Sequence, residues 1–167
     1  MKIISIQNSS KQLLKYFDCG EPFLNEYLKQ YALKNDSNSS AKTFLCVDDE
    51  EKNLIGYFSL CTSSIQFNEY EPEYLEKIPR YPISCIKIAR LAVAKEYQGH
   101  KIGAYLLKEC FAKILKISST VGFYLIVVDA KESSYGFYEH YGFTKLKEDS
   151  LTYFLRTSTL IKAVMES

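Results

Sequence analysis

Residues 123–130 read FYLIVVDA, a nearly continuous apolar run bounded by Gly122 and Asp129. A strand without alternating polar residues is typical of the centre of a sheet that is covered on both faces. The segment KIGAYLLKECFAKILKIS at 101–118 has apolar residues at helical spacing. They are Ile102, Leu106, Cys110, Ile114 and Ile117. An amphipathic helix followed by a buried strand predicts an α/β fold with helices packed on a sheet.

The rest of the chain extends this pattern in the order β-α-α-β-β-β-α-β-α-β-β, which predicts a mixed sheet. Strands are expected at residues 1–6, 42–49, 53–67, 83–97 and 123–130, with a final hairpin over 143–158. Helices are expected at 9–17, 21–35, 101–118 and 132–141, and an irregular loop at 68–82. No internal repeat or linker interrupts the sequence, so residues 1–167 are expected to form a single domain.

Composition narrows the classes of function. Hydrophobic residues make up 47% and charged residues 25%, as in an ordinary soluble globular protein. No apolar run is long enough to span a membrane, and the N-terminus MKIISIQNSSKQ lacks the features of a signal peptide. We therefore expect a cytoplasmic protein. The net charge of +1 gives no general basic field for nucleic acid, although the 21 basic residues can form a local patch.

The five cysteines form no C-x-x-C pair, and no histidine cluster lies near them. This spacing predicts neither a disulfide framework nor a metal site. Cys46, Cys61 and Cys85 lie in strand-like runs and are expected to be small buried apolar residues.

The stretch YQGHKIGAYLL at 97–107 places glycine, histidine and lysine where the long helix begins. The first four N–H groups of a helix have no partner within it and carry a partial positive charge. A strand, a glycine and a helix start in succession are therefore typical of a phosphate site. Neither G-x-x-x-x-G-K-[ST] nor G-x-G-x-x-G fits the stretch. The alternative, in which Gly99 only turns the chain and Gly103 only packs on the sheet, stays open.

The segment IARLAVAKEYQGHKIGAYLLKEC at 88–110 resembles the acetyl-CoA-binding motif of the GNAT acetyltransferases, which is [Q/R]-x-x-G-x-[G/A] after a strand. The segment FYEHYGF at 137–143 resembles the second hallmark of that family. The resemblance covers nearly the whole chain and implies the GNAT acyl-CoA N-acyltransferase fold, a mixed sheet with splayed central strands. It also implies acetyl-CoA as the co-substrate and no metal.

Carried over to this sequence, the motif assigns two sets of cofactor-binding residues. The backbone of Leu91, Ala92 and Val93 is expected to pair with the pantetheine arm like an added strand. The backbone amides of the next loop are expected to hold the pyrophosphate, and they belong to Gln98, Gly99, His100, Lys101, Ile102, Gly103 and Ala104. Lys101 departs from the family pattern, which usually has glycine there. Its amide can still donate, while its side chain must turn away or contact a phosphate.

Acetyl transfer from a thioester requires a neutral amine and a proton donor for the leaving thiolate. Tyr138 stands where GNAT enzymes often have a phenol near the CoA sulfur, so the resemblance implies that it is the general acid. A tyrosine with a pKa of about 10 is protonated at neutral pH and suits that role. The alternative is that Tyr138 only fills the core. Tyr135, His140 and Tyr141, on the same short helix, are expected to be packing or rim residues.

A general base is harder to assign. The strand ISCIKIARLAV contains no Asp or Glu, and the sequence does not fix the position of Glu69, Glu71 and Glu73 in the loop before this strand. A lysine ε-amine, with a pKa of about 10.4, benefits from a base, whereas an α-amine, with a pKa of about 8, can lose its proton to water. The lack of an evident base therefore favours an α-amine as acceptor.

The N-terminal segment FDCGEPFLNEYLKQYALKN at 17–35 and the motif segment resemble one branch of the family, the toxins of toxin–antitoxin pairs that acetylate aminoacyl-tRNA. This resemblance implies aminoacyl-tRNA as substrate and an antitoxin as partner, and many GNAT proteins also form homodimers. The candidates for binding the tRNA are basic residues, namely Lys29, Lys34, Lys42, Lys87 and Arg90. Each is also consistent with an ordinary solvated charge.

Two other functions stay open. One is a GNAT enzyme that acetylates a small-molecule amine or a protein N-terminus, which an Asp/Glu pair beside the thioester would favour. The other is a CoA-binding domain without catalysis, which Lys101 in place of glycine supports and Tyr138 opposes. The near-zero net charge argues against the toxin hypothesis unless the basic and acidic residues are segregated.

Overall fold

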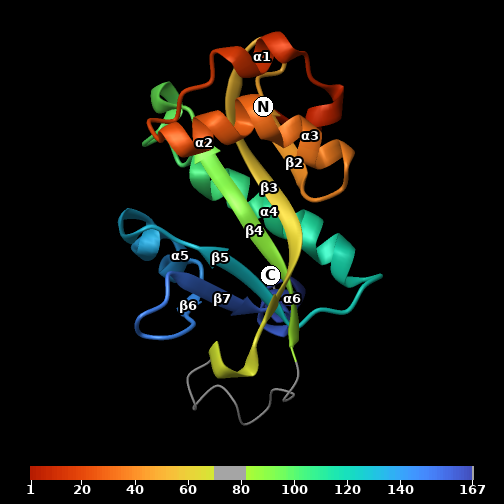
Figure 1. The fold of residues 1–167 in the computed structure, drawn as a ribbon, viewed down its shortest axis with the longest axis vertical. Helices are drawn as coiled ribbons and strands as arrows, with labels where there is room; N and C mark the ends of the chain where they lie inside the picture. The colour runs from red at the N-terminus through yellow and green to blue at the C-terminus, as the bar shows by residue number, and fades with distance from the viewer. Residues whose placement is uncertain (70–81, 167) are drawn as a thin grey trace. The chain divides into compact units, whose positions relative to one another are not determined.

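The computed structural model describes residues 1–69 and 82–166. Contacts divide the chain into two compact units, and Figure 1 shows their helices and strands. Unit 1 comprises Met1–Cys61 and Ala89–Ala112, and unit 2 comprises Thr62–Ile88 and Lys113–Ser167. The single domain expected over the whole chain stays a prediction.

The N-terminal strands of unit 1 are antiparallel. β1 (Lys2–Ser5) pairs with β2 (Lys42–Val47), and β2 pairs with β3 (Leu54–Ile65). Ile4 lies opposite Leu45 across the first pair, so apolar side chains of neighbouring strands share a face. The strands expected at 42–49 and 53–67 are therefore present and form an antiparallel pair.

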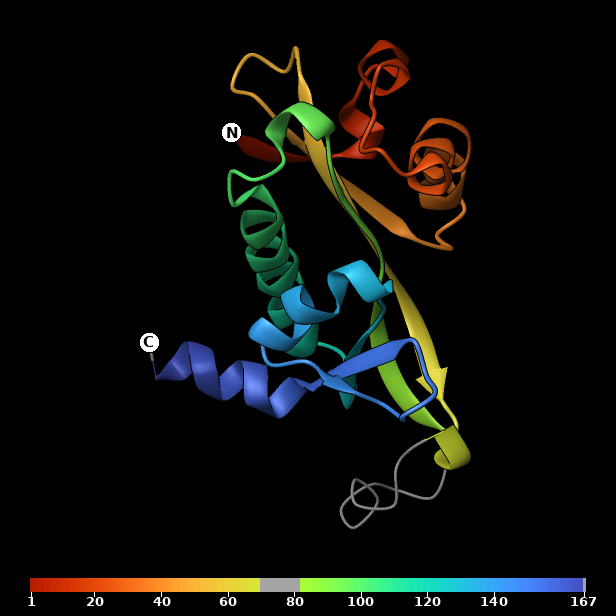
Figure 2. The same cartoon turned by 90° about the vertical axis from the view of Figure 1, so that its left-hand side faces the viewer.

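Helical segments cover both faces of the unit 1 strands. Figure 2 shows α1 (Lys11–Lys15), α2 (Pro22–Glu26), η2 (Tyr27–Tyr31) and α3 (Ala32–Ser37) on one face, and the first turns of α4 (Ile102–Ser118) on the other. The core under the first group includes Leu14, Phe17, Leu28, Tyr57 and Ala92. Both faces of the unit 1 strands are thus covered, as an α/β fold requires.

The helix expected at 21–35 is present, but it contains a π turn. Within η2, the N–H of Ala32 donates to the carbonyl of Tyr27, five residues earlier. This wider turn changes which residues face the core. Leu28 is buried, whereas Phe23 and Tyr31, which a regular α-helix would place near the face of Leu28, are 59% and 48% exposed.

Helix α4 lies directly against β3 and β4 (Ile83–Val93) at Gly56. A Cβ at Gly56 would lie 2.6 Å from the carbonyl oxygen of Ala92 and 2.8 Å from Cδ1 of Leu106. Glycine is therefore required for this close approach. Leu106 and Cys110 are fully buried, as the helical pattern predicted.

Unit 2 combines parallel and antiparallel pairs. β4 pairs in parallel with β5 (Leu125–Asp129) over three residues that start at Cys85. β7 (Thr152–Arg156) is antiparallel to β5 and to β6 (Thr144–Lys145). The core of this unit consists of Ile65, Ile83, Cys85, Leu125, Val127, Leu146 and Phe154. The apolar run FYLIVVDA thus contains a buried strand with neighbours on both sides, as predicted, although β5 is shorter than the expected 123–130 and Tyr124 is 44% exposed.

The strands pair in the order β1-β2-β3-β4-β5-β7-β6, and this mixed sheet, with α5 (Tyr135–His140) between β5 and β6 in the chain, confirms the predicted fold class. The final hairpin was predicted too long. β7 ends at Arg156, and a further helix, α6 (Thr157–Met165), follows it. The splaying of the central strands stays a prediction.

Candidate active site

The turn between β4 and α4 has an unusual backbone. After β4 ends at Val93, Gly99 has a φ of 78° and Lys101 a φ of 60°, and α4 begins at Ile102. Both φ values lie in the left-handed region, where glycine has no steric penalty. The usual glycine of the family motif at position 101 therefore has a conformational reason, and Lys101 adopts the same conformation at a cost.

The N–H groups of this turn are available to a ligand. Within the described part of the chain, the backbone N–H groups from Gly99 to Ala104 donate to no protein acceptor. The first hydrogen bond of the helix runs from Tyr105 N–H to Lys101 O at 3.2 Å. A Cβ built at Gly99 would meet no atom within 4 Å, so the space before the turn is open. Unpaired N–H groups at a helix start fit a diphosphate. The turn therefore fits the pyrophosphate of acetyl-CoA.

Gln98 supports this turn by a different contact from the one expected. Its N–H donates to Lys95 O at 3.3 Å, so it is already used within the protein. Its side-chain amide donates to Cys19 O and Val93 O, both at 2.9 Å. Gln98 therefore fixes the end of β4 and the start of the loop, while six amides, from Gly99 to Ala104, remain for a diphosphate.

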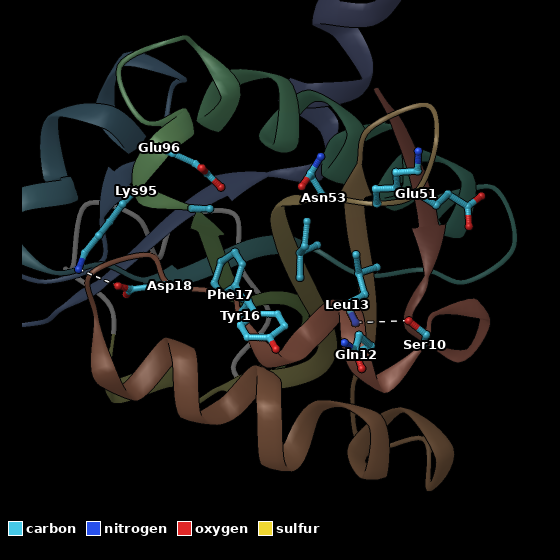
Figure 3. A pocket seen from close by; sticks show the side chains of 13 residues that line it. Ser10, Gln12, Leu13, Tyr16, Phe17, Asp18, Glu51, Asn53, Lys95 and Glu96 are labelled. Atoms are coloured by element: carbon cyan, nitrogen blue, oxygen red, sulfur yellow. Dashed lines mark hydrogen bonds and ion pairs between the residues drawn. The ribbon is translucent and has the colours of Figure 1, made fainter.

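An ion pair between Asp18 and Lys95, 2.7 Å apart, joins the N-terminal segment to the same turn (Figure 3). Gly20 N–H and the Asn25 amide donate to the same carboxylate at 2.9 and 2.8 Å. The Lys95 hydrogen bond, followed by these two, holds the pKa of Asp18 well below its usual range. Sequence reasoning missed this network, because 77 residues separate Asp18 from Lys95.

The open pocket in Figure 3, about 630 Å³, has the Asp18–Lys95 pair among its lining residues. Glu96 and Glu51 also line it. This mixture of charges singles out no ligand.

The three residues expected to bind pantetheine lie at the end of β4. Leu91, Ala92 and Val93 follow the part of β4 that pairs with β5, which ends at Lys87. Ala92 is buried, and Leu91 and Val93 are half-buried. Pairing of this segment with pantetheine stays a prediction.

Tyr138 lies on α5 in unit 2 and is 7% exposed. Its ring meets Phe137 and Phe143 edge-on, with centroids 5.1 and 5.5 Å away. Its carbonyl accepts the N–H groups of Tyr141 and Phe143 at 3.0 and 3.1 Å. The two ring contacts restrict the direction of the phenol, as a positioned acid requires, and they are equally those of a core residue.

The other aromatic residues of α5 pack within the protein. Tyr135 lies against Tyr153, with ring centroids 5.1 Å apart, and the hydroxyl of Tyr153 donates to Glu139 at 3.3 Å. His140 and Tyr141 meet edge-on at 5.0 Å.

Two of the five basic candidates are paired within the protein. The ammonium of Lys87 contacts Asp129 at 2.5 Å, and Lys42 contacts Asp36 at 3.3 Å. Their charges are compensated there. Lys29 is exposed on η2.

Arg90 is held by aromatic rings. Its guanidinium lies 4.7 Å from the ring centroids of both Phe23 and Tyr27. Among the described residues, its buried Nε has no hydrogen-bond partner. Phe23, whose exposure the helical pattern does not explain, covers this cation.

The carboxylates considered as bases give no assignment. Glu69 accepts the N–H of Gln66 and so caps its own turn, η3 (Phe67–Glu69). Glu71 and Glu73 lie outside the described residues, as does most of the loop expected at 68–82.

Other features of the described part of the chain are simple. All five cysteines are unbridged; Cys46 and Cys85 are buried as expected, and Cys61 is half-buried. Residues 1–69 and 82–166 contain no group of three metal-ligating side chains and no helix both long and apolar enough to cross a membrane.

Residues 6–153 match the family model described as acetyltransferase (GNAT) domain. This match covers most of the chain, and the described structure has the corresponding fold and the open turn before α4. The chain therefore belongs to the GNAT acetyltransferase family.

Two relatives, one of them in two structures, are informative. A tRNA-acetylating toxin of Mycobacterium tuberculosis (strain ATCC 25618 / H37Rv) is 27% identical over 136 residues, which cover 81% of this chain and 80% of the relative. The structure of AtaT complexed with acetyl-methionyl-tRNAfMet has a TM-score of 0.86 at 26% identity and covers 98% of both chains. A point mutant of the AtaT toxin bound to the C-terminus of the antitoxin AtaR has a TM-score of 0.80 at 25% identity, with 97% and 96% covered.

Proposed function

We propose that this chain transfers the acetyl group of acetyl-CoA to the α-amine of aminoacyl-tRNA, and that it blocks translation as the toxin of a toxin–antitoxin pair. The observation that carries the proposal is similarity over nearly the full length to tRNA-acetylating toxins. The family membership and the open turn before α4 support acetyl-CoA as co-substrate. Charged tRNA is found in the cytoplasm, so that is where the protein would act.

In this reaction acetyl-CoA supplies an acetyl thioester, whose carbonyl carbon the amine attacks while the bond to sulfur breaks. The N–H groups from Gly99 to Ala104 bind the diphosphate and so fix the position of the thioester along β4. The hydroxyl of Tyr138 gives its proton to the leaving sulfur. The proton of the amine leaves through water, which an α-amine with a pKa of about 8 allows.

The antitoxin complex of AtaT supports a partner of the same kind for this chain. An antitoxin that covers the acceptor side would keep the enzyme inactive. The homodimer expected from the family stays a prediction.

The test uses purified protein, labelled acetyl-CoA and a mixture of charged tRNAs, with deacylated tRNA, polyamines and peptides in parallel reactions. We expect label on charged tRNA alone. Replacing Tyr138 by phenylalanine should lower kcat by about 100-fold or more, because a general acid is removed. Tyr141→Phe, at the residue that follows the same helix, is the matched control and should retain activity. Label on peptides or polyamines in place of charged tRNA would contradict the proposal.

A further inference from the structure

A groove lies between α1 and the segment formed by η2 and α3, all within unit 1. It is open and has a volume of about 690 Å³. Four of the residues that line the groove are lysines, and no Asp or Glu is among the lining residues. These lysines are Lys11, Lys15, Lys29 and Lys34, and we call this the lysine groove.

The four ammonium groups have no carboxylate partner within the described part of the chain. Lysines that do form ion pairs there include Lys2, Lys42, Lys52, Lys87 and Lys95. All four side chains of the lysine groove are exposed. Since the whole chain has a net charge of only +1, the groove is a local concentration of uncompensated positive charge. This segregation removes the objection that near-zero net charge raises against a nucleic-acid substrate.

The backbone brings these charges together at a cost. Lys11 and Lys15, four residues apart on α1, are neighbours on one helical face, and like charges at this spacing destabilise a helix by about 0.2–0.5 kcal/mol. Lys29 and Lys34 are five residues apart, which in a regular α-helix would separate them by about 140° around the axis. The π turn η2 begins before Lys29 and widens the helix there, and both lysines line the same groove. A polyanion in the groove would offset the repulsion.

Two exposed tyrosines that adjoin groove residues in the chain favour a nucleic acid over an acidic peptide, although neither lines the groove and Tyr16 lines the pocket of Figure 3. Tyr16 is 72% exposed, and the ammonium of Lys15 lies 5.4 Å from the centroid of its ring. Tyr31, next to the groove in the sequence, is 48% exposed. Exposed rings among lysines provide stacking for bases next to contacts for phosphates. Lysines without arginine form point-charge contacts that are independent of sequence.

We propose, on the basis of the function proposed above, that the lysine groove binds the phosphate backbone of the tRNA substrate. The groove provides affinity for any tRNA and takes no part in acetyl transfer itself. Its loss should therefore raise the KM for charged tRNA and leave kcat and the KM for acetyl-CoA unchanged.

The experiment compares Lys29→Ala/Lys34→Ala with Lys147→Ala/Lys162→Ala, which removes the same charge from exposed positions of unit 2. Binding of fluorescent tRNA is measured by anisotropy over a range of salt concentrations. The groove variant should lose about two units of the slope of log K against log salt, and bind about ten- to thirtyfold more weakly at 0.15 M salt. The control variant and Lys29→Arg/Lys34→Arg should keep the wild-type slope.

Two results would overturn the lysine groove while the proposed function stands. One is a wild-type slope in the groove variant, together with normal acetylation of charged tRNA. The other is binding of a polyglutamate peptide that the groove variant alone loses while its tRNA binding is normal, which would assign the groove to an acidic protein segment. Wild-type protein that acetylates no charged tRNA would instead overturn the proposed function itself.

Discussion

Replacing Lys101 by glycine is expected to stabilise the protein, because Lys101 has a φ of 60°. A residue with a Cβ is destabilised by about 1–2 kcal/mol in this left-handed conformation. Glycine avoids that strain but adds about 0.5–1 kcal/mol of conformational entropy cost on folding. The net gain is about 0.5–1 kcal/mol. With a urea dependence of about 2 kcal/mol per molar, the midpoint of unfolding should rise by about 0.3–0.5 M.

Two control variants separate the causes. His100→Gly changes a neighbour that has no positive φ, so it should lower stability by about 0.5–1 kcal/mol. Lys101→Ala removes the ammonium and keeps the strained backbone, so its midpoint should match the wild type. The KM for acetyl-CoA should be the same in Lys101→Gly as in the wild type, because the proposed contacts to the diphosphate come from backbone amides and not from the lysine side chain. A Lys101→Gly protein that unfolds at lower urea than the wild type would refute the strain.

Three further predictions concern packing, the support of the turn and pH. Gly56→Ala should lower the free energy of unfolding by about 2–3 kcal/mol, because its Cβ would lie 2.6 Å from a backbone oxygen, whereas Gly122→Ala, with no atom within 4 Å, should not. Gln98→Ala should lower the free energy of unfolding by about 1–3 kcal/mol and raise the KM for acetyl-CoA, whereas Gln98→Arg, which keeps the donors, should restore the KM. Equal KM values in the alanine and arginine variants would contradict this. Burial raises the pKa of Cys46 to about 11 and that of Cys85 to about 12, so both stay protonated when folded and ionise at lower pH when unfolded. Stability should be complete below pH 9 and fall between about pH 9 and 12, which urea midpoints would show; a constant midpoint would contradict the burial effect.

Much of the fold could be predicted from periodicity. The run FYLIVVDA fits only a strand covered on both faces, and the apolar residues of α4 lie on one face of a helix, which must pack on the sheet. The π turn could not, because Phe23 and Tyr31 fit an α-helical stripe, and the contact of Phe23 with Arg90 joins residues 67 positions apart in the sequence. Helix α6 was missed because the preceding LTYFLRTS is rich in residues that favour strands. In both segments, contacts with distant residues determine the local structure.

The candidate site shows the same division. The glycine-containing turn could be predicted from a short motif, and the structure adds that position 101 has a left-handed backbone. Lys87 could be chosen as a tRNA contact from its strand position, but Asp129, 42 residues away, neutralises it. Lys11 and Lys15 could not be chosen from the sequence, because only the fold brings them to the same groove as Lys29 and Lys34.

The central claim is that the acetyl group is placed on the α-amine of an amino acid carried by tRNA. The most direct measurement is mass spectrometry of the aminoacyl-adenosines that nuclease releases after purified protein has reacted with acetyl-CoA and charged tRNA. We predict aminoacyl-adenosine with one acetyl group on the α-amine, and about 100-fold less of it in the same reaction time with the Tyr138→Phe variant. Unmodified aminoacyl-adenosine from a preparation that acetylates peptides or polyamines would contradict the account.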